Sequence, residues 1–363
     1  MKNIFYYKFI IFTIIIIFLV ALFTVSKKTV PSSFIETMTS IYKSDEDYSS
    51  KQILNIQLNS NTYPPGYFSQ SNTILKLTNY AIKASRNSAY DGKYISIQMI
   101  QYVLSRGCRW LDFEVYYNLD SNNNPQCIVG YSINKNSTYP VILNSVPVPL
   151  YRVITKTIQN AMIYQSGNTY FTTNTEDPLF IHIRIKCTSE NKEKMYDLVN
   201  KIINQIMSQD AYSKYQCTFM NNINSNTLLN QISNKVIFVF DYDSTLLESE
   251  IYQNKILNNY LICGNGVIYN IPASQVNLDK YPSIEPPKII SNDMVSLTKI
   301  QFVETDNENA VNVNLYSAIY NYGYQIVEQK YYMNDNNLKN NELYWQNYTQ
   351  GIVLMSYILN YMK

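Results

Sequence analysis

The chain has 363 residues, and 46% of them are hydrophobic, which is enough for one large core or two ordinary ones and excludes disorder throughout. Lys and Arg total 29 against 27 Asp and Glu, so the net charge of +2 offers no basic excess for binding nucleic acid. Five scattered cysteines are too few for a disulfide scaffold, and a single histidine excludes any mechanism that needs a histidine pair.

An apolar run begins the chain. From Phe9 to Val25 every residue except two threonines is apolar, and two lysines lie on each side. A run of this length can cross a hydrocarbon layer about 30 Å thick. A cleaved signal peptide is the alternative, but its apolar region is usually about 7–15 residues, and the Ala-x-Ala cleavage site is missing. We therefore expect residues 1–28 to form a transmembrane anchor in a membrane, with the side that the rest of the chain faces left undecided.

Residues 29–75 are polar and lack a sustained period, so we expect a linker between the anchor and a folded domain at residues 76–357. Within that domain, strand-like and helix-like patterns alternate. The strands are expected at residues 77–84, 110–117, 126–131, 179–187, 235–240, 297–303 and 324–332, and the helices at residues 96–104, 150–164, 191–207 and 311–322.

This alternation predicts an α/β fold built from parallel β/α units. Seven or eight units in about 285 residues favour a closed TIM-type (β/α)8 barrel over an open, doubly wound sheet, which stays the alternative. The sequence shows no internal repeat and no clear second domain.

Two carboxylates lie on one face of the strand at residues 110–117. Asp112 and Glu114 alternate with apolar residues that would face the helices, so both acids should point into the barrel near the carboxyl end of the strand. They would form either an ion pair or a site for calcium or magnesium. The spacing alone favours the ion pair, and Arg184 on the strand at residues 179–187 is the expected counter-ion of Asp112.

His182 precedes Arg184 by two residues on the same face, which places it about 6.6 Å deeper in the barrel. We expect it to make a structural hydrogen bond and not to act in catalysis. The stretch from Asp241 to Thr245 resembles the first motif of haloacid dehalogenase-type phosphatases, with Asp241 as nucleophile and Asp243 as acid/base. The later cluster at residues 304–308 lacks the Gly-Asp form of that family's magnesium site, so the stretch is interpreted as an ordinary strand-to-loop exit.

Several motifs occur in one order along residues 75–355. The most specific is Arg-Gly-Cys-Arg-Trp-Leu-Asp-Phe-Glu at residues 106–114. It resembles the Arg-Gly-Cys-Arg-x-x-Glu-Leu-Asp strand of phosphatidylinositol-specific phospholipases C. Residues 85–88 are similar to the Ser-His-Asn-Thr that opens the family's X region, and residues 129–132 lie where the family has His-Gly-x-Thr. Residues 177–188, 234–237 and 325–344 follow the family's later strands and its closing helix. The resemblance implies membership of the phospholipase C-like phosphodiesterase superfamily.

The departures from that pattern concern the catalytic groups. Family members cleave a phosphodiester with two histidines, and here Arg86 stands at the first histidine position and Val129 at the second. In calcium-dependent members the metal ligands match Asn87, Asp112, Glu114 and the position of Arg184. An arginine there would repel a metal, so the resemblance implies a site closed by ion pairs and no cofactor.

Two functions follow from these residues. The favoured one is a membrane-anchored, catalytically degenerate barrel that acts as a binding or structural module, with Arg86, Asn87, Asp112, Glu114 and Arg184 as its binding residues. If acidic side chains do not form an ion pair with Arg86, this residue could hold the phosphate of a phosphoinositide or another phosphodiester ligand. The alternative is a divergent phosphoric diester hydrolase. In it Arg86 stabilises charge, Asp112 or Glu114 acts as general base, and Asn87 joins the two acids in holding calcium or magnesium. The sequence does not indicate the oligomeric state.

Overall fold

A computed structural model of the chain describes residues 75–134, 136–141, 144–163, 175–217, 223–264, 267–269, 287–297, 300–304, 308–346, 348 and 351–361. The expected anchor at residues 1–28 and all of the expected linker except residue 75 lie outside these residues. Within the described part of the chain, no helix combines the length and the apolar character that crossing a membrane requires.

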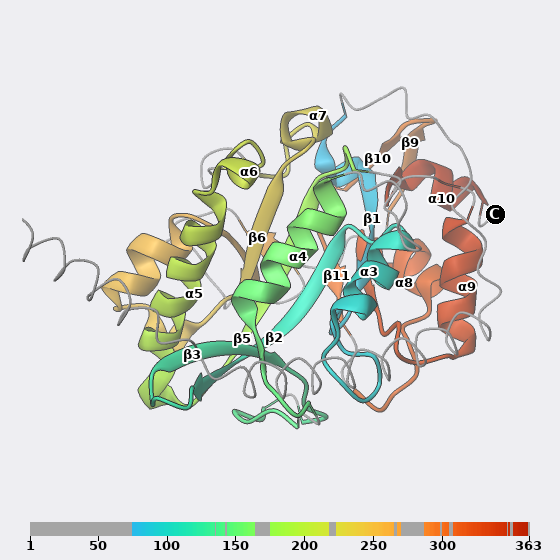
Figure 1. Cartoon of the computed structure of the whole chain (residues 1–363). Coiled ribbons are helices and arrows are strands. Elements are labelled where there is room, and N and C mark those ends of the chain that lie inside the picture. The colour runs from blue at the N-terminus through green and yellow to red at the C-terminus, as the bar shows by residue number, and fades with distance from the viewer. Residues whose placement is uncertain are drawn as a thin grey trace, which may run out of the picture. The chain divides into compact units, whose positions relative to one another are not determined.

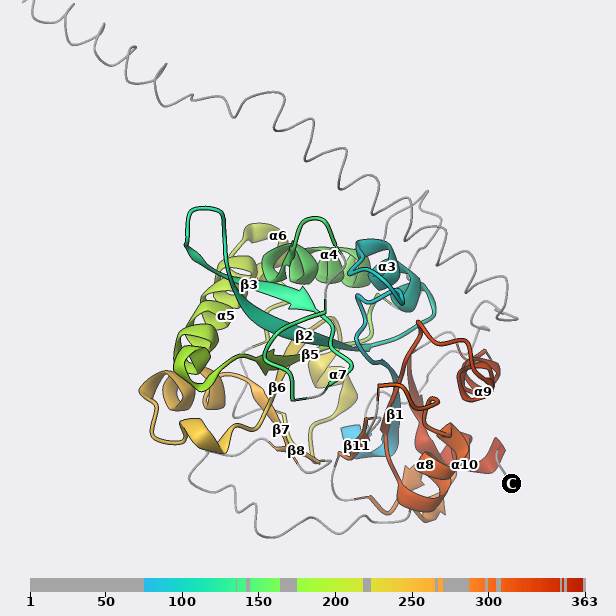
Figure 2. The ribbon, with the colours of Figure 1, turned by 90° about the horizontal axis from the view of Figure 1, so that it is seen from below.

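The core of the described part is a curled sheet of parallel strands in the order β11-β12-β1-β2-β5-β6-β7. The last of these strands in the chain pairs with the first, so the sheet follows the chain order of a barrel. Figure 2 shows the curl, with the helices outside it. The strands are β1 (Tyr80–Ser85), β2 (Trp110–Leu119), β5 (Leu179–Lys186), β6 (Val236–Asp241), β7 (Leu261–Gly264), β11 (Phe302–Val303) and β12 (Ile326–Gln329).

This arrangement confirms an α/β fold of TIM type, but the described strands do not close the barrel that the sequence analysis expects. Strand β8 (Val267–Tyr269) pairs antiparallel with β7 and ends the sheet on that side. The opposite end is β11, and no pairing joins β8 to β11 among the described residues. Of the described residues in the expected strand at 297–303, the two of β11 form a strand.

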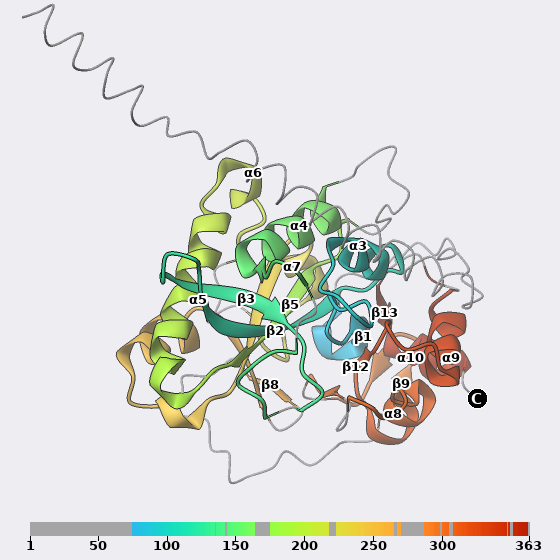
Figure 3. The ribbon, with the colours of Figure 1, turned by 60° about the horizontal axis from the view of Figure 1, so that its bottom comes forward.

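The predicted strand at residues 126–131 forms, but it runs in the opposite direction to its neighbour. Strand β3 (Pro125–Gly130) pairs antiparallel with β2 as a long hairpin, and β4 (Val148–Pro149) pairs antiparallel with β3 (Figure 3). Asp120 fixes the turn, because its Oδ1 accepts hydrogen bonds from the backbone amides of Asn122 and Asn124, both at 2.8 Å. Glu114 and Gly130 are therefore direct partners in the hairpin.

Besides β4, β7 and β8, three further strands were not expected from the sequence. Strand β13 (Ile352–Leu354) pairs antiparallel with β1, and β9 (Ile289–Ser291) forms a separate two-stranded sheet with β10 (Met294–Val295). All three strands have only two or three residues, too few for an alternating pattern to stand out.

Helices cover the outer face of the curled sheet (Figure 1). Helix α3 (Ile97–Ser105) begins after Ser96, whose hydroxyl accepts from the amide of Met99, and α8 (Leu315–Tyr322) ends at Gly323 with φ +69°. The other helices are α4 (Leu150–Met162), α5 (Lys192–Met207), α6 (Asp210–Ser213), α7 (Leu229–Ile232), α9 (Asn336–Trp345) and α10 (Met355–Tyr361), with a π-helix at Tyr252–Leu257.

The two faces of β2 separate as the alternation predicts. Leu111, Phe113 and Val115 are fully buried in a core shared with α3, α4 and α5. On the opposite face, Trp110 packs with Phe180 and other apolar residues inside the curl. These apolar side chains lie one layer deeper in the curl than Asp112 and Glu114. The two acids therefore stand at the carboxyl end of the sheet, above an apolar layer.

Candidate active site

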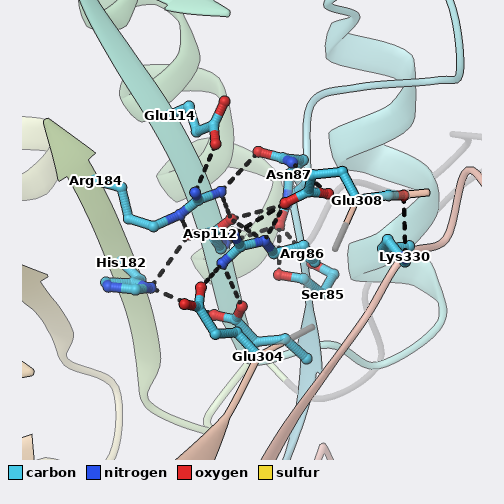
Figure 4. Close-up of polar contacts among 12 residues, drawn as sticks. Ser85, Arg86, Asn87, Asp112, Glu114, His182, Arg184, Glu304, Glu308 and Lys330 are labelled. Atoms are coloured by element: carbon cyan, nitrogen blue, oxygen red, sulfur yellow. Dashed lines mark hydrogen bonds and ion pairs between the residues drawn. The ribbon is translucent and has the colours of Figure 1, made fainter. Parts of the chain in front are cut away.

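Charged side chains gather on the inner face of the sheet at the carboxyl ends of its strands. The register places Asp112 beside His182, and Glu114 beside Arg184, on the neighbouring strands β2 and β5. Figure 4 shows these side chains turned toward one another and toward the end of β1. The residues predicted from the sequence that meet here are Arg86, Asn87, Asp112, Glu114 and Arg184.

Arg184 is the central residue of the first half of the site, which it forms with Asp112, Glu114 and Asn87. Its Nε and Nη2 donate to the two oxygens of Asp112 at 2.6 and 2.7 Å, and its Nη1 donates to Glu114 Oε1 at 2.6 Å. Burial acts to lower the pKa of Arg184, but the charges of Asp112 and Glu114 outweigh burial and raise the pKa well above its ordinary value. The structure thus has the ion pair that the strand pattern predicts.

Asn87 completes this half. Its side-chain Oδ1 accepts a hydrogen bond from Arg184 Nη2 at 2.9 Å, while its backbone amide donates to Asp112 Oδ2 at 2.9 Å. The residue has φ +46°, a left-handed conformation that asparagine adopts more readily than most residues. The turn after β1 therefore presents both the amide and the side chain of one residue to the ion pair.

Arg86 is the central residue of the second half of the site, and glutamate carboxylates bind its guanidinium. Its Nε and Nη2 donate to Glu308 Oε1 at 3.1 and 3.0 Å, its Nη1 donates to Glu328 Oε2 at 3.1 Å, and a further bond from Nη1 reaches Glu304. The Arg86 side chain has no exposed surface. The condition under which Arg86 was expected to hold a phosphate is therefore not met in this structure.

Sequence reasoning missed the three glutamates that bind Arg86. Glu328 follows Ile326 on the inner face of β12, and a glutamate two residues after a buried isoleucine in an expected strand was the available signal. Glu304 and Glu308 lie after β11, where no periodic pattern marks them. They entered the sequence analysis only as part of a cluster that fails the dehalogenase motif.

Burial affects the acids of the site differently. Burial acts to raise the pKa of Asp112, but the guanidiniums of Arg184 and Arg86 outweigh it and hold the pKa well below its usual value. Burial and the nearby charge of Asp112 raise the pKa of Glu328, against the opposing effects of His182 and Arg86. Asp112 is therefore the firmly ionised partner of the two arginines.

Val129 does not lie at the mouth of the site, where the family resemblance places a catalytic histidine. The hairpin register pairs Val129 with Val115, so its side chain points to the helix-covered face, where it is 1% exposed. The antiparallel register turns the neighbouring Gly130 to the inner face and Val129 away from it, so the residue at the position matched to the second histidine faces the helices.

His182 is fully buried below Arg184, and it makes the structural contacts expected for it. Its Nδ1 lies 3.2 Å from Asp112 Oδ1 and 3.3 Å from Glu328 Oε1, and its Nε2 lies 2.9 Å from Asp241 Oδ1. Burial acts to lower the pKa of His182, but Asp241 and the hydrogen bond to Asp112 raise it well above its ordinary value.

The Asp241 to Thr245 stretch behaves as a strand exit. Asp241 ends β6 and contacts His182, while Asp243 caps the following 3-10 turn by accepting from the Thr245 amide at 3.1 Å. Asp243 also forms an ion pair with Lys192 at 2.9 Å. These contacts fit the interpretation as an ordinary turn better than an arrangement of phosphatase nucleophile and acid.

The residues matching the family's calcium ligands do not fit a calcium ion here. Three nitrogens of the Arg184 guanidinium already donate to Asn87, Asp112 and Glu114. The other oxygen of Glu114 accepts from the Tyr116 hydroxyl at 2.8 Å. A cation placed among these oxygens would have to displace a buried positive charge, so the ion pairs take the place of the metal.

Comparison with protein families finds one relationship for the first half of the described domain. The sequence model of the family "Phosphatidylinositol-specific phospholipase C, X domain" matches residues 75–239. This range holds Arg86, Asn87, Asp112, Glu114 and Arg184, but not the glutamates that bind Arg86. Among curated proteins, none matches the sequence of this chain.

Solved structures with a similar arrangement are distant in sequence. S. officinalis PLC21 aligns with a TM-score of 0.46 and 12% identity over 80% of this chain, and L. pealei PLC21 with 0.45 and 12% over 78%. The chain spans only 38% of the length of either of these proteins. A calcium-dependent phosphoinositol-specific phospholipase C from Pseudomonas sp. aligns with a TM-score of 0.40 and 10% identity over 56% of this chain and 71% of its own.

Proposed function

From the match of residues 75–239 to the X domain of phosphatidylinositol-specific phospholipase C, we propose that the chain is a catalytically degenerate member of the phospholipase C-like phosphodiesterase superfamily that serves as a binding or structural module. The observation that carries the proposal is the position of Arg184. Its guanidinium occupies the oxygens of Asn87, Asp112 and Glu114, the residues that the family pattern matches to a metal. A site built to hold a cation for catalysis is filled by the protein's own cation.

The proposal is also supported by the lack of a suitable proton carrier in the described site. The only histidine of the chain, His182, is buried beneath the ion pairs and contacts three carboxylates. A general base works best with a pKa near the working pH, whereas the two arginines hold the pKa of Asp112 well below its usual value. These features argue against the alternative hydrolase, in which Asp112 or Glu114 would take a proton.

Arg86 supports the same conclusion. A phosphate would need the Arg86 guanidinium, but Glu308 and Glu328 bind it inside the protein. A phosphoinositide headgroup could bind there only by displacing these carboxylates or the partly exposed Glu304. Any binding function therefore uses other groups or requires the site to open.

Membrane anchoring through residues 1–28 remains part of the proposal, and the apolar run from Phe9 to Val25 supports it. Full-length protein should stay in the membrane pellet after a carbonate wash. Mature protein that begins after residue 25 would instead show that the run is a signal peptide.

A calcium titration tests the degenerate site. Because Arg184 stands among the ligands, millimolar calcium should leave the melting temperature of the full-length protein in detergent unchanged. The variant Arg184→Glu adds a carboxylate at the same place, and calcium should raise its melting temperature, since a ligand that binds only the folded state stabilises it. A calcium-dependent rise in the unmodified protein would contradict the proposal.

A further inference from the structure

Beneath the ion pairs lies a second group of donors that the proposed function does not use. His182 of β5, Asp241 of β6 and Cys263 of β7 bring one nitrogen, one oxygen and one sulfur within 4.8 Å of one another. We propose that these three residues bind a zinc-type transition-metal ion. The proposal does not rest on the loss of phosphodiester cleavage.

The sheet itself assembles this group. His182 pairs with Val239 across β5 and β6, and Asp241 comes two residues after Val239, so it points to the same face one step nearer the mouth. Asp241 in turn pairs directly with Cys263 on β7. Three neighbouring parallel strands therefore each supply one donor to one point on the inner face.

The donor set matches zinc better than calcium. Zinc binds imidazole nitrogen, thiolate sulfur and carboxylate oxygen at about 2.0–2.3 Å, whereas calcium takes oxygen ligands. For a tetrahedral ion at those distances, neighbouring ligand atoms lie roughly 3.3–3.8 Å apart. The His182 to Asp241 separation of 2.9 Å would have to open slightly, and the partly exposed Asp241 side chain is the one that can turn to do this.

The hydrogen-bond partners of His182 give an independent reason to expect a metal ion at this group. Its Nδ1 lies 3.2 Å from Asp112 and 3.3 Å from Glu328, while its Nε2 faces Asp241. Histidines that bind metal characteristically donate their other ring N–H to a carboxylate, which fixes the tautomer and leaves the opposite nitrogen for the ion. The two carboxylates behind His182 provide this arrangement.

Access and charge are also suitable. The Asp241 side chain is 45% exposed, whereas His182 and Cys263 are buried, so an ion can enter from the Asp241 side and keep a water molecule as its fourth ligand. Within the described part of the chain, Asp241 forms its ion pair with His182, and its charge also acts on Lys186, where it opposes the lowering of the Lys186 pKa by burial. The carboxylate is thus not already bound to an arginine, in contrast to Asp112.

Cobalt is the probe for this site, because Co²⁺ adopts zinc-like geometry and a cobalt–thiolate bond absorbs light. Full-length protein in detergent, stripped with a chelator and kept reduced, should bind a single Co²⁺ with a thiolate charge-transfer band. Zinc should displace the cobalt, since it binds such sites more tightly. Calcium in excess should not.

Variants assign the ligands. Cys263→Ser should abolish the thiolate band, and Cys187→Ser, which removes another buried free cysteine outside the group, should keep it. Glu328→Gln alters a contact of His182 Nδ1, together with the bonds that Glu328 accepts from Arg86 and Trp110, and should weaken cobalt binding about 10–100-fold. The absence of a thiolate band in the unmodified protein, or its survival in Cys263→Ser, would overturn the proposal. The first of these outcomes needs no variant to fold.

Discussion

Two buried groups of charges lie on opposite faces of the curled sheet near β1, and they are built differently. On the helix-covered face, the single carboxylate of Glu342 accepts from Lys83 at 2.8 Å, from Arg106 Nε at 2.6 Å and from the Tyr331 hydroxyl at 2.6 Å. On the inner face, Arg86 and Arg184 are each surrounded by carboxylates. The first group is a carboxylate satisfied by donors, and the second is a pair of guanidiniums satisfied by acceptors.

The difference separates a packing contact from the group that we propose is a degenerate site. Glu342 belongs to α9, and its bonds to Lys83 on β1 and Arg106 after α3 hold three outer elements together. The inner group lies at the carboxyl ends of the strands, where TIM-type folds carry their chemistry. Its acids outnumber its arginines, as expected if carboxylates suited to a metal were retained and cations filled the space between them.

The largest expected effect comes from breaking the inner group. Arg184→Met leaves Asp112 and Glu114 buried without their main counter-charge, and removal of one partner from a buried pair costs about 3–5 kcal/mol. Urea unfolding of the full-length protein should show a loss at the upper end of this range or beyond it.

Two controls sharpen this result. Lys201→Met breaks an exposed pair with Asp197 and should cost at most about 1 kcal/mol. Adding Asp112→Asn and Glu114→Gln to Arg184→Met should recover most of the loss, since the unpaired charges are then gone. A triple variant no more stable than Arg184→Met would show that the loss comes from packing and not from charge.

A smaller effect is expected on the helix-covered face. Glu342→Gln keeps an acceptor for Tyr331, the Lys83 ammonium still donates to the Arg106 carbonyl, and the Arg106 side chain is 10% exposed, so some charge remains solvated. We expect a loss of about 3 kcal/mol, at the lower end of the range for buried pairs. Urea unfolding at neutral pH measures it.

The same variant has a defined pH dependence. Burial acts to raise the pKa of Glu342, but Lys83 and Arg106 outweigh burial and lower it below its usual value. Its contribution to stability is therefore present above the unfolded pKa of about 4.3 and is lost as the pH falls through the folded pKa. The difference in unfolding free energy between wild type and Glu342→Gln should be constant near neutral pH and shrink in acid. A difference that grows in acid would contradict the assignment.

Much of this site could be predicted from the sequence because strand periodicity and parallel register act locally. Two-residue spacing puts Asp112 and Glu114 on one face, and parallel pairing with β5 brings Arg184 to the level of Glu114. The same periodicity places the apolar residues of β2 against the helices. The same pattern predicts most of the main parallel strands, but β7 was not expected, and the strand expected at residues 126–131 pairs antiparallel as β3.

The remainder depends on long-range geometry. The glutamates around Arg86 are 218 to 242 residues away in the chain, and nothing local links them to it. The face to which Val129 points could not be predicted, because the direction of β3 and its register are set by the turn at Asp120, which a motif comparison does not take into account. Closure of the barrel could not be judged from the number of β/α units alone, because β8 runs antiparallel at the edge of the described sheet.

Turnover of phosphatidylinositol tests the central claim most directly. Purified full-length protein, with calcium present, should release no inositol phosphate above the buffer level from phosphatidylinositol vesicles, because Arg184 fills the metal position and His182 is buried. Turnover of even about 1 s⁻¹, within the ordinary range of enzymes, would contradict the account if it survives His182→Ala and falls with Arg86→Ala.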